Sequence, residues 1–307
     1  MASETVITMR IEQLPIERDK LGEGAVWDHR IGALYWMDHF RHLVRRYIPA
    51  INEVHEWVLP KIGGCACLTD DPGTIVVALS DAFALLHLKT GMVEEVAHVP
   101  QPRPAVRLSD GRADRGGSFV VGSAVTDFAG YDGAIYRLNH DFSVDELKPG
   151  MMLSNSICFQ PDGSRMHFTD TRSGVVMVCA YAHEGPLPSE EVIFGDAREH
   201  GASPDGATVD AEGGVWVAQI RTGEITRFAP DGSFDRQIKL PVPHATSVAF
   251  GGKALDVLYV TTVRETGMQI KTDHPQAGAI FAIHDLGVSG VEEGYFNLGG
   301  CRAARGA

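Results

Sequence analysis

Three oxygen-bearing side chains, Glu23, Asn155 and Asp205, occur at matching positions ahead of glycine-containing turns. Asn155 and Asp205 each lie eight residues before a turn glycine, and Glu23 lies nine residues before one, in a turn that is one residue longer. Two carboxylates and an amide oxygen that face one point suit Ca²⁺, Mg²⁺ or Mn²⁺ and less typically hold Zn²⁺ or Fe²⁺. Without a cation the carboxylates would repel each other, and their pKa values would shift. The spacing therefore predicts one divalent metal site.

The same count from other turn glycines reaches Cys65, Ser109 and His244. A histidine at this position could bind a substrate or relay protons, and the competing interpretation is a structural histidine beside the Pro-Val-Pro turn. Asp205, within Ser-Pro-Asp-Gly, could likewise be an ordinary turn residue, and Asn155 could cap a turn. The position that these residues share favours a functional site over separate structural roles.

Short strands between turns must position these side chains, because long amphipathic helical patterns are nearly absent. Runs of four to eight β-branched and aromatic residues, such as ALYWMD, SFVVGS and GVWVAQI, each follow a turn. A second hydrophobic run follows most of them, as in GAIYRLNHD and GEITRFAPDG. The turn glycines lie roughly 39 to 50 residues apart along the chain: Gly32, Gly73, Gly117, Gly163, Gly213 and Gly252.

Six units of this size, each with four strands, predict an all-β, six-bladed β-propeller. Radial closure would protect the sheet edges of so long an all-β chain. The innermost strand of each blade lines the central channel, so the residues just before these strands converge at one mouth, a natural polar site. We expect one domain over residues 1–307, with a core of about 15–290 and a flexible tail at GGCRAARGA.

Composition excludes several classes of partner. The net charge is −13 and no Lys/Arg-rich run occurs, so neither nucleic acid nor an anionic membrane is expected to bind. No run of about 18 apolar residues predicts a membrane span, and no apolar region near the N-terminus predicts a signal peptide. An odd, scattered set of cysteines is typical of reduced thiols in the cytoplasm, where we expect a monomer or small homo-oligomer. The cysteines are Cys65, Cys67, Cys158, Cys179 and Cys301.

Six longer motifs occur in a fixed order and spacing. They are LGEGAVWD (21–28), RLSDGRAD (107–114), NSICFQPDG (155–163), SPDGATVDAEGGVWVA (203–218), RFAPDG (227–232) and TSVAFGGKALDVLYVTT (246–262). Over roughly residues 15–290 the chain resembles the SMP-30/gluconolactonase/regucalcin family. The resemblance implies a six-bladed propeller with one divalent metal in its channel, and it implies metal ligands at Glu23, Asn155 and Asp205.

The resemblance also implies residues that contact the substrate. The substrate-binding arginine of the family falls on Arg107. Ser109 stands where the family's Arg-x-Asn-Asp-Gly motif has asparagine, which leaves the exact sugar open. An acidic contact of the family falls on Asp127. His244 is a candidate substrate-binding residue from the repeat spacing alone.

The implied reaction is hydrolysis of a small sugar lactone, an aldonolactone, to the corresponding aldonic acid. A divalent ion (Ca, Zn, Mn, Mg or Fe) polarises the carbonyl group and lowers the pKa of water. Asp205 is the candidate general base as well as a ligand. Arg107 could hold ring hydroxyls or stabilise the developing oxyanion, and Ser109 could bind a hydroxyl.

Other substrates and functions remain open at this point. If Arg103, Arg172 and His39 approach the mouth from loops, an anionic sugar lactone becomes plausible. A phosphotriesterase or arylesterase on the same scaffold would need a more apolar pocket. A non-enzymatic calcium-binding propeller would bind the ion without turnover. A serine hydrolase is not expected, because the sequence has no Gly-x-Ser-x-Gly motif.

Overall fold

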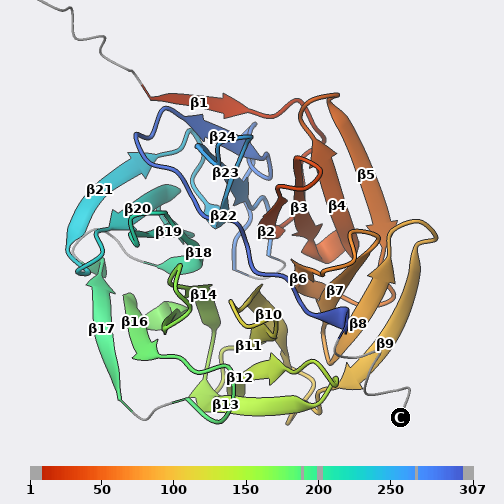
Figure 1. The fold of residues 1–307 in the computed structure, drawn as a ribbon. Helices are drawn as coiled ribbons and strands as arrows, with labels where there is room; N and C mark the ends of the chain where they lie inside the picture. Colours follow the sequence, from red (N-terminus) through yellow and green to blue (C-terminus); the bar gives the residue numbers. More distant parts are fainter. Residues whose placement is uncertain (1–8, 188–189, 199–202, 267–268, 300–307) are drawn as a thin grey trace, which may run out of the picture.

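The computed structural model describes residues 9–187, 190–198, 203–266 and 269–299. Six four-stranded antiparallel sheets stand as blades around a central axis (Figure 1). In every blade the innermost strand pairs with the strand that follows it along the chain. The predicted all-β, six-bladed propeller is confirmed.

The first three blades each consist of four consecutive strands. From the axis outward, these strands are β2 (Gly22–Asp28), β3 (Ala33–Asp38), β4 (Leu43–Ile48) and β5 (Glu53–Val58); β6 (Gly63–Leu68), β7 (Thr74–Leu79), β8 (Ala82–His87) and β9 (Met92–His98); and β10 (Val106–Ala113), β11 (Phe119–Val125), β12 (Gly133–Leu138) and β13 (Val144–Met151).

Blades four and five repeat this order, and the sixth blade takes its outermost strand from the N-terminus. The strands are β14 (Ser154–Phe159), β15 (Arg165–Asp170), β16 (Val175–Ala180) and β17 (Glu191–Asp196); β18 (Pro204–Val209), β19 (Val215–Gln219), β20 (Glu224–Phe228) and β21 (Phe234–Lys239); and β22 (Ala245–Gly251), β23 (Val257–Thr262), β24 (Phe281–His284) and β1 (Arg10–Gln13).

Pairing between β1 and β24 closes the ring. The two strands run antiparallel, with Arg10 opposite His284 and Gln13 opposite Phe281. Figure 1 shows the red β1 beside the blue β24 at the rim of the last blade. The two ends of the chain therefore share one sheet, and residues 10–13 extend the packed structure beyond the expected 15–290.

Apolar side chains fill the space between neighbouring blades. One cluster packs Tyr35 and Met37 of the first blade against Val77 and Leu79 of the second, and all four are almost fully buried. Period-2 alternation within each strand places such residues on both faces of the sheet, because each blade is covered on both sides. The packed blades hold the innermost strands in place around the axis.

Every innermost strand begins with a shift in ladder register. In β2 the shift lies between Glu23 and Val26, and in β14 it lies between Asn155 and Cys158. Such β-bulges break the strict alternation of side chains and can aim consecutive residues in new directions. We call the end of the axis where these strands begin the mouth, and the opposite end the base.

A C-terminal segment, residues 290–299, crosses the base. Gly290 bridges to Asp210 in the fifth blade, and Phe296, which is fully buried, bridges to Thr69 in the second. Figure 1 shows this dark blue segment crossing the middle of the ring. Residues 291–298 thus also pack beyond the expected core. Of the tail GGCRAARGA, all but the first glycine lies outside the described residues.

One guanidinium stands on the axis and ties this segment to several blades. Arg112 of β10 donates from Nη1 to Glu293 Oε1 at 2.9 Å and to the main-chain oxygen of Ala25 at 3.0 Å. Its Nη2 donates to the main-chain oxygen of Ala207 at 2.6 Å. Four parts of the ring therefore meet at one side chain.

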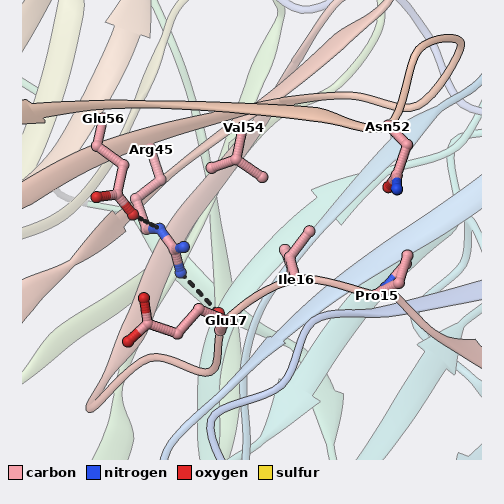
Figure 2. A pocket seen from close by; sticks show the side chains of 7 residues that line it. All are labelled: Pro15, Ile16, Glu17, Arg45, Asn52, Val54 and Glu56. Carbon is pink, nitrogen blue, oxygen red and sulfur yellow. Dashed lines mark hydrogen bonds and ion pairs between the residues drawn. The ribbon is translucent and has the colours of Figure 1, made fainter.

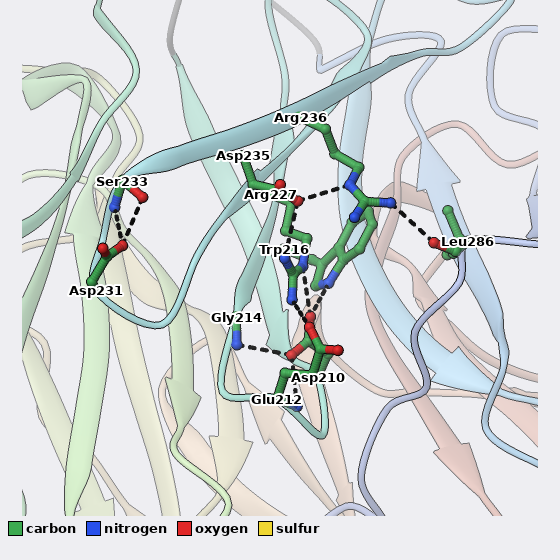
Figure 3. Close-up of polar contacts among 10 residues, drawn as sticks. All are labelled: Asp210, Glu212, Gly214, Trp216, Arg227, Asp231, Ser233, Asp235, Arg236 and Leu286. Carbon is green, nitrogen blue, oxygen red and sulfur yellow. Dashed lines mark hydrogen bonds and ion pairs between the residues drawn. The ribbon is translucent and has the colours of Figure 1, made fainter.

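The turns at the base are held by fully partnered aspartates. Asp210 Oδ1 accepts main-chain N–H groups of Glu212 and Gly214 at 3.0 and 2.8 Å. Its Oδ2 accepts Nε1 of Trp216 and Nε of Arg227, both at 2.8 Å. Figure 3 shows these contacts converging on one carboxylate. We call this group the Asp210 network.

Two further sequence expectations can be compared with the fold. Cys65, Cys67, Cys158 and Cys179 are free and buried, as expected, and Cys301 lies outside the described residues. None of the helices within the described part of the chain is long and apolar enough to cross a membrane.

Candidate active site at the mouth of the propeller

The strands β2, β14 and β18 carry Glu23, Asn155 and Asp205, each at the second position of its strand. Asn155 and Asp205 are almost fully buried, and Glu23 is partly exposed. β14 and β18 also contact each other here, because the Ser156 hydroxyl donates to the main-chain oxygen of Asp205. The predicted ligand positions therefore all lie at the mouth.

The strand ladders separate these residues into two positions. Glu23 pairs with Met37 and Asn155 with Thr169, immediately before the register shift. Asp205 instead lies inside the shift of β18, between the paired residues Pro204 and Ala207. Counting from the turns had treated all these positions as equivalent. The bulge is what allows a residue one step further along β18 to join the same site.

A third carboxylate, Asp110, belongs to the site and was missed from the sequence. It lies beside Ser109 within the shift of β10, where simple alternation would have turned it away from the mouth. Asp110 is buried, and its Oδ2 accepts the main-chain N–H of Ile157 at 3.1 Å. The glycine that follows Asp110 was the signal in the sequence, because a glycine inside a strand often marks a bulge. The structure explains why this residue is glycine, since a Cβ at Gly111 would lie 2.6 Å from the main-chain oxygen of Val120.

Burial raises the pKa values of all three carboxyl groups, and neighbouring carboxylates raise those of Glu23 and Asp205 further. Burial, and then the charge of Asp110, raises the pKa of Glu23 to about 8, against an opposing effect of Arg107. Burial, and then the charges of Glu23 and Asp110, raises the pKa of Asp205 well above its ordinary value. Burial also raises the pKa of Asp110, while Arg112 opposes that shift. The charges of Arg107 and Arg112 offset these shifts only in part.

The donor set at the mouth fits a divalent cation. Asn155 Nδ2 donates to Thr171 Oγ1 at 2.8 Å, which fixes the amide and leaves its oxygen as the acceptor. Among the described residues, no three His, Cys, Asp or Glu side chains could hold a metal ion by themselves. An ion at the mouth would therefore use the amide oxygen of Asn155 together with Glu23 and Asp205, a set of hard oxygen ligands.

Arg107 and Ser109 lie next to these carboxylates on β10. Burial lowers the pKa of Arg107 to about 10, and the charge of Glu23 opposes that shift. Arg107 Nη1 is buried and has no hydrogen-bond partner. Ser109 is partly exposed. Both residues are therefore placed to contact a ligand at the mouth. Arg107 also has a buried donor without a hydrogen-bond partner among the described residues.

His244 lies directly before β22, at the mouth edge of the sixth blade. Its Nδ1 is 2.7 Å from the main-chain oxygen of Ile220, which can only accept a hydrogen bond. Nδ1 therefore carries the proton, and in the neutral ring Nε2 is an acceptor. This contact gives His244 a structural role and also fixes which nitrogen could meet a ligand.

Asp127, the expected acidic contact, is exposed and paired with Arg103. The hydrogen bond from Arg103 lowers the pKa of Asp127. Arg103 also contacts Asp132, with Nε 2.6 Å from Oδ2. The charge of Arg103 is thus balanced by two carboxylates. Arg172 lies over the ring of Phe128, 6.0 Å from its centroid, so both arginines hold the loop after β11.

His39 follows β3 in a short 3₁₀ helix, η1 (His39–Arg41). Its main-chain N–H donates to the oxygen of Leu21 at 2.9 Å, which places it beside the start of β2. The ring is buried, and neither nitrogen has a hydrogen-bond partner. Burial, and then the charges of Arg107 and His42, lowers the pKa of His39 well below its ordinary value.

A groove of about 600 Å³ lies elsewhere, between the N-terminal segment and the outer strands of the first blade. Its central guanidinium, Arg45, pairs with Glu56 and Asp19 and donates to the main-chain oxygen of Glu17. Figure 2 shows Arg45 between Glu17 and Glu56. The guanidinium of this groove is thus ion-paired with two carboxylates, whereas Arg107 Nη1 at the mouth has no hydrogen-bond partner among the described residues.

Known proteins share much of this chain's sequence. A family model described as SMP-30/Gluconolactonase/LRE-like region matches residues 21–264. L-arabinolactonase of Azospirillum brasilense is 34% identical over 269 residues, which cover 86% of this chain and 88% of that protein. 6-deoxy-6-sulfogluconolactonase of Pseudomonas putida is 32% identical over 277 residues, which cover 90% and 94% of the two chains.

A solved structure shares the fold closely. The calcium-binding protein regucalcin from Agrobacterium tumefaciens matches with a TM-score of 0.85 and 27% identity. The match covers 92% of this chain and 96% of that chain. The match to the family model contains Glu23, Asn155 and Asp205, the three residues that meet at the mouth.

Proposed function

The chain belongs to the SMP-30/Gluconolactonase/LRE-like family, and from that premise we propose that it hydrolyses a small sugar lactone to the corresponding aldonic acid. The family expected from the sequence motifs is correct, and lactonases among its relatives make the chain a hydrolase of carboxylic esters. One observation carries the proposal. Glu23, Asp110 and Asp205 gather at the mouth, where burial and neighbouring carboxylates raise the pKa values of Glu23 and Asp205 despite the opposing charge of Arg107 on Glu23.

A divalent cation bound by Glu23, Asn155 and Asp205 supports this chemistry. When bound, it supplies Lewis acidity for the lactone carbonyl and acidifies water. The fixed amide of Asn155 and the two carboxylates are the ligands that such an ion prefers. Asp110 adds a further negative charge beside Glu23 and Asp205, which strengthens the attraction for a cation.

Asp205 is the proposed general base. One of its oxygens takes a proton from the attacking water as the water oxygen bonds to the lactone carbonyl carbon. The bond between that carbon and the ring oxygen then breaks, and the proton held by Asp205 passes to the departing ring oxygen. The products are a free hydroxyl and a carboxylic acid, so atoms and protons balance without a covalent intermediate on the protein.

Arg107 and Ser109 bind the substrate in this proposal. The unpartnered Nη1 of Arg107 donates to the carbonyl oxygen as negative charge develops, or to a ring hydroxyl. The Ser109 hydroxyl bonds a substrate hydroxyl with a shorter reach than asparagine would have. His244 offers its Nε2 as an acceptor at the edge of the site, and Asp127 acts from the loop that Arg103 holds.

The test begins with protein stripped of metal by a chelator. Aldonolactones are screened by proton release after single additions of Ca²⁺, Zn²⁺, Mn²⁺, Mg²⁺ or Fe²⁺. We expect turnover only with added metal, and we expect Asp205→Ala to lose about 10³-fold or more in kcat. Asp231→Ala is the matched control, because that aspartate lies in an exposed turn and caps only Ser233.

Two outcomes would replace the proposal. Cleavage of a phosphotriester such as paraoxon, with all sugar lactones inert, would identify a different hydrolase on the same scaffold. Calcium binding without any turnover would identify a calcium-binding protein, which is what the Agrobacterium tumefaciens regucalcin is called.

A further inference from the structure

His39 is a buried polar side chain that the proposed mechanism does not use. Its exposed fraction is 2%, yet neither Nδ1 nor Nε2 has a hydrogen-bond partner. A buried polar group left unpaired destabilises the folded protein. An aliphatic side chain at this position would avoid that cost, so the imidazole calls for a partner from outside the chain.

The position of His39 links it to the mouth. Asp38, which precedes it, pairs with Gly22 of β2, and Gly22 precedes the proposed ligand Glu23. The 3₁₀ helix that begins at His39 therefore stands at the mouth edge of the first blade. The main chain of His39 therefore lies beside the first-blade part of the site, and His39 is not one of the proposed metal ligands.

Arg107 connects His39 to the third blade. Its charge acts on both His39 and Glu23, and its strand, β10, contacts β2, which carries Glu23. Arg107 Nη1 is also buried and unpartnered. Two blades thus contribute unpaired nitrogen atoms to the same part of the mouth. Both His39 nitrogens and Arg107 Nη1 lack a hydrogen-bond partner among the described residues, and a substrate placed between the two side chains could bond to both.

We infer that His39 is a specificity-determining residue that binds a hydroxyl group of the lactone together with Arg107. This inference rests on the proposed function and extends it to the substrate class. A neutral imidazole has one donor and one acceptor nitrogen, and a hydroxyl can both accept and donate. An anionic group can only accept, which would leave one nitrogen of His39 unpaired. The group of the lactone that meets His39 is therefore a hydroxyl rather than an anionic group.

The surroundings of the other cations agree with this choice. Arg103 is balanced by Asp127 and Asp132, so it offers little attraction to an anion. Burial beside Arg107 keeps the imidazole of His39 uncharged. The pairing of Arg103 removes the main reason for expecting an anionic lactone.

The test compares two lactones on the metal-loaded protein. One is a polyhydroxylated aldonolactone, and the other is an unsubstituted ring of the same size. We expect His39→Leu to lower kcat/KM for the hydroxylated lactone by about 10- to 100-fold, because one hydrogen-bonded hydroxyl loses its partner. The unsubstituted lactone should change by less than about twofold, and the melting temperature should not fall.

Two further variants complete the experiment. His39→Gln keeps one donor and one acceptor, and we expect it to recover part of the lost kcat/KM. His55→Leu, on the outermost strand of the first blade, is the matched control and should change neither substrate. Calcium affinity, measured by calorimetry, should be the same in wild type and His39→Leu.

The outcomes separate this inference from the proposed function. Wild-type protein that hydrolyses neither lactone overturns the proposed function and this inference with it. Active wild type with equal losses for both lactones in His39→Leu, or with no loss, overturns only the role of His39. A wild type that prefers a lactone carrying a carboxylate, with that preference lost in His39→Leu, also overturns it.

Discussion

Buried carboxylates occur at both ends of this propeller, and their surroundings differ. At the base, Asp210 receives four hydrogen bonds, including one from the guanidinium of Arg227 (Figure 3). At the mouth, burial and the charge of Asp110 raise the pKa values of Glu23 and Asp205, and the charge of Glu23 adds to the shift of Asp205. The same chain therefore surrounds a carboxylate with hydrogen-bond donors at the base, and it leaves carboxyl groups with raised pKa values at the mouth.

The difference teaches where stability and function reside. A buried charge without partners is costly, and a buried ion pair that loses one partner is costlier still. The Asp210 network uses its partners to fasten a turn between β18 and β19. The mouth keeps its oxygens for a cation and a substrate. Substitutions at the two ends should therefore have opposite effects on folding and on catalysis.

The largest expected effect is on catalysis at the mouth. Asp205→Asn should lower kcat by about 10³-fold or more, because it removes the proposed base and a ligand charge. The same variant should be at least as stable as wild type without metal, because an unpaired buried carboxylate becomes neutral. Kinetics and urea unfolding of chelator-treated protein measure both. A variant that is both unstable and inactive would contradict the comparison.

The next largest effect is on folding at the base. Asp210→Ala should reduce the free energy of unfolding by about 3–5 kcal/mol, because Arg227 and Trp216 keep buried donors without their acceptor. The folded fraction should retain the wild-type kcat. Denaturant titration followed by assay at low temperature tests this. A stable variant with a reduced kcat would show that the two ends are not separate in function.

A third effect is on the pH dependence of stability. The pKa of Glu23 rises from 4.5 to about 8 on folding. A carboxyl with a raised folded-state pKa stabilises the protein fully below the lower value, and this stability is lost as pH rises through the higher one. Metal-free protein should therefore lose stability between about pH 4.5 and about pH 8.

Glu23→Gln is the matched variant for this effect, because it keeps the shape and cannot ionise. Its stability should change less across the same pH window, and added divalent cation should rescue only the wild type at the higher pH. Urea midpoints at several pH values give the answer. A loss of stability with rising pH that is the same in both proteins would assign the effect to other groups.

The smallest expected effect lies between the two ends. Glu293→Gln should cost about 1–3 kcal/mol of stability, because Arg112 loses a charged partner and keeps main-chain acceptors in the first and fifth blades. The change in kcat should be less than about threefold. Thermal unfolding and assay measure the two quantities, and an effect as large as that of Asp210→Ala would be unexpected.

Much of the fold followed from the sequence, because turn glycines and short apolar runs recur wherever a blade repeats. The same recurrence predicted that Glu23, Asn155 and Asp205 would lie at one end of the axis. The sequence did not predict Asp110 as a site residue, because its orientation depends on a bulge that strand alternation does not reveal. The sequence also did not predict that His39 is buried without a hydrogen-bond partner. Its burial and the nearby charge of Arg107 both arise from parts of the chain that are distant in sequence.

The sequence also did not predict contacts between distant parts of the chain. The pairing of Arg103 with Asp127 joins two loops that no periodic pattern relates. The C-terminal segment carries no strand pattern, and its packing depends on Phe296 fitting between other elements. Such contacts are set by three-dimensional packing, whereas the repeat describes one blade at a time.

The pairing of β1 with β24 has a consequence for the order of assembly. The last sheet is complete only when Arg10 pairs with His284, and these two residues are very far apart in the sequence. Such contacts slow folding, because a long loop must close before they form. A chain still emerging from the ribosome can build early blades but cannot join its own two ends. The mouth, which draws on the first, third, fourth and fifth blades, is therefore finished only when synthesis is nearly complete.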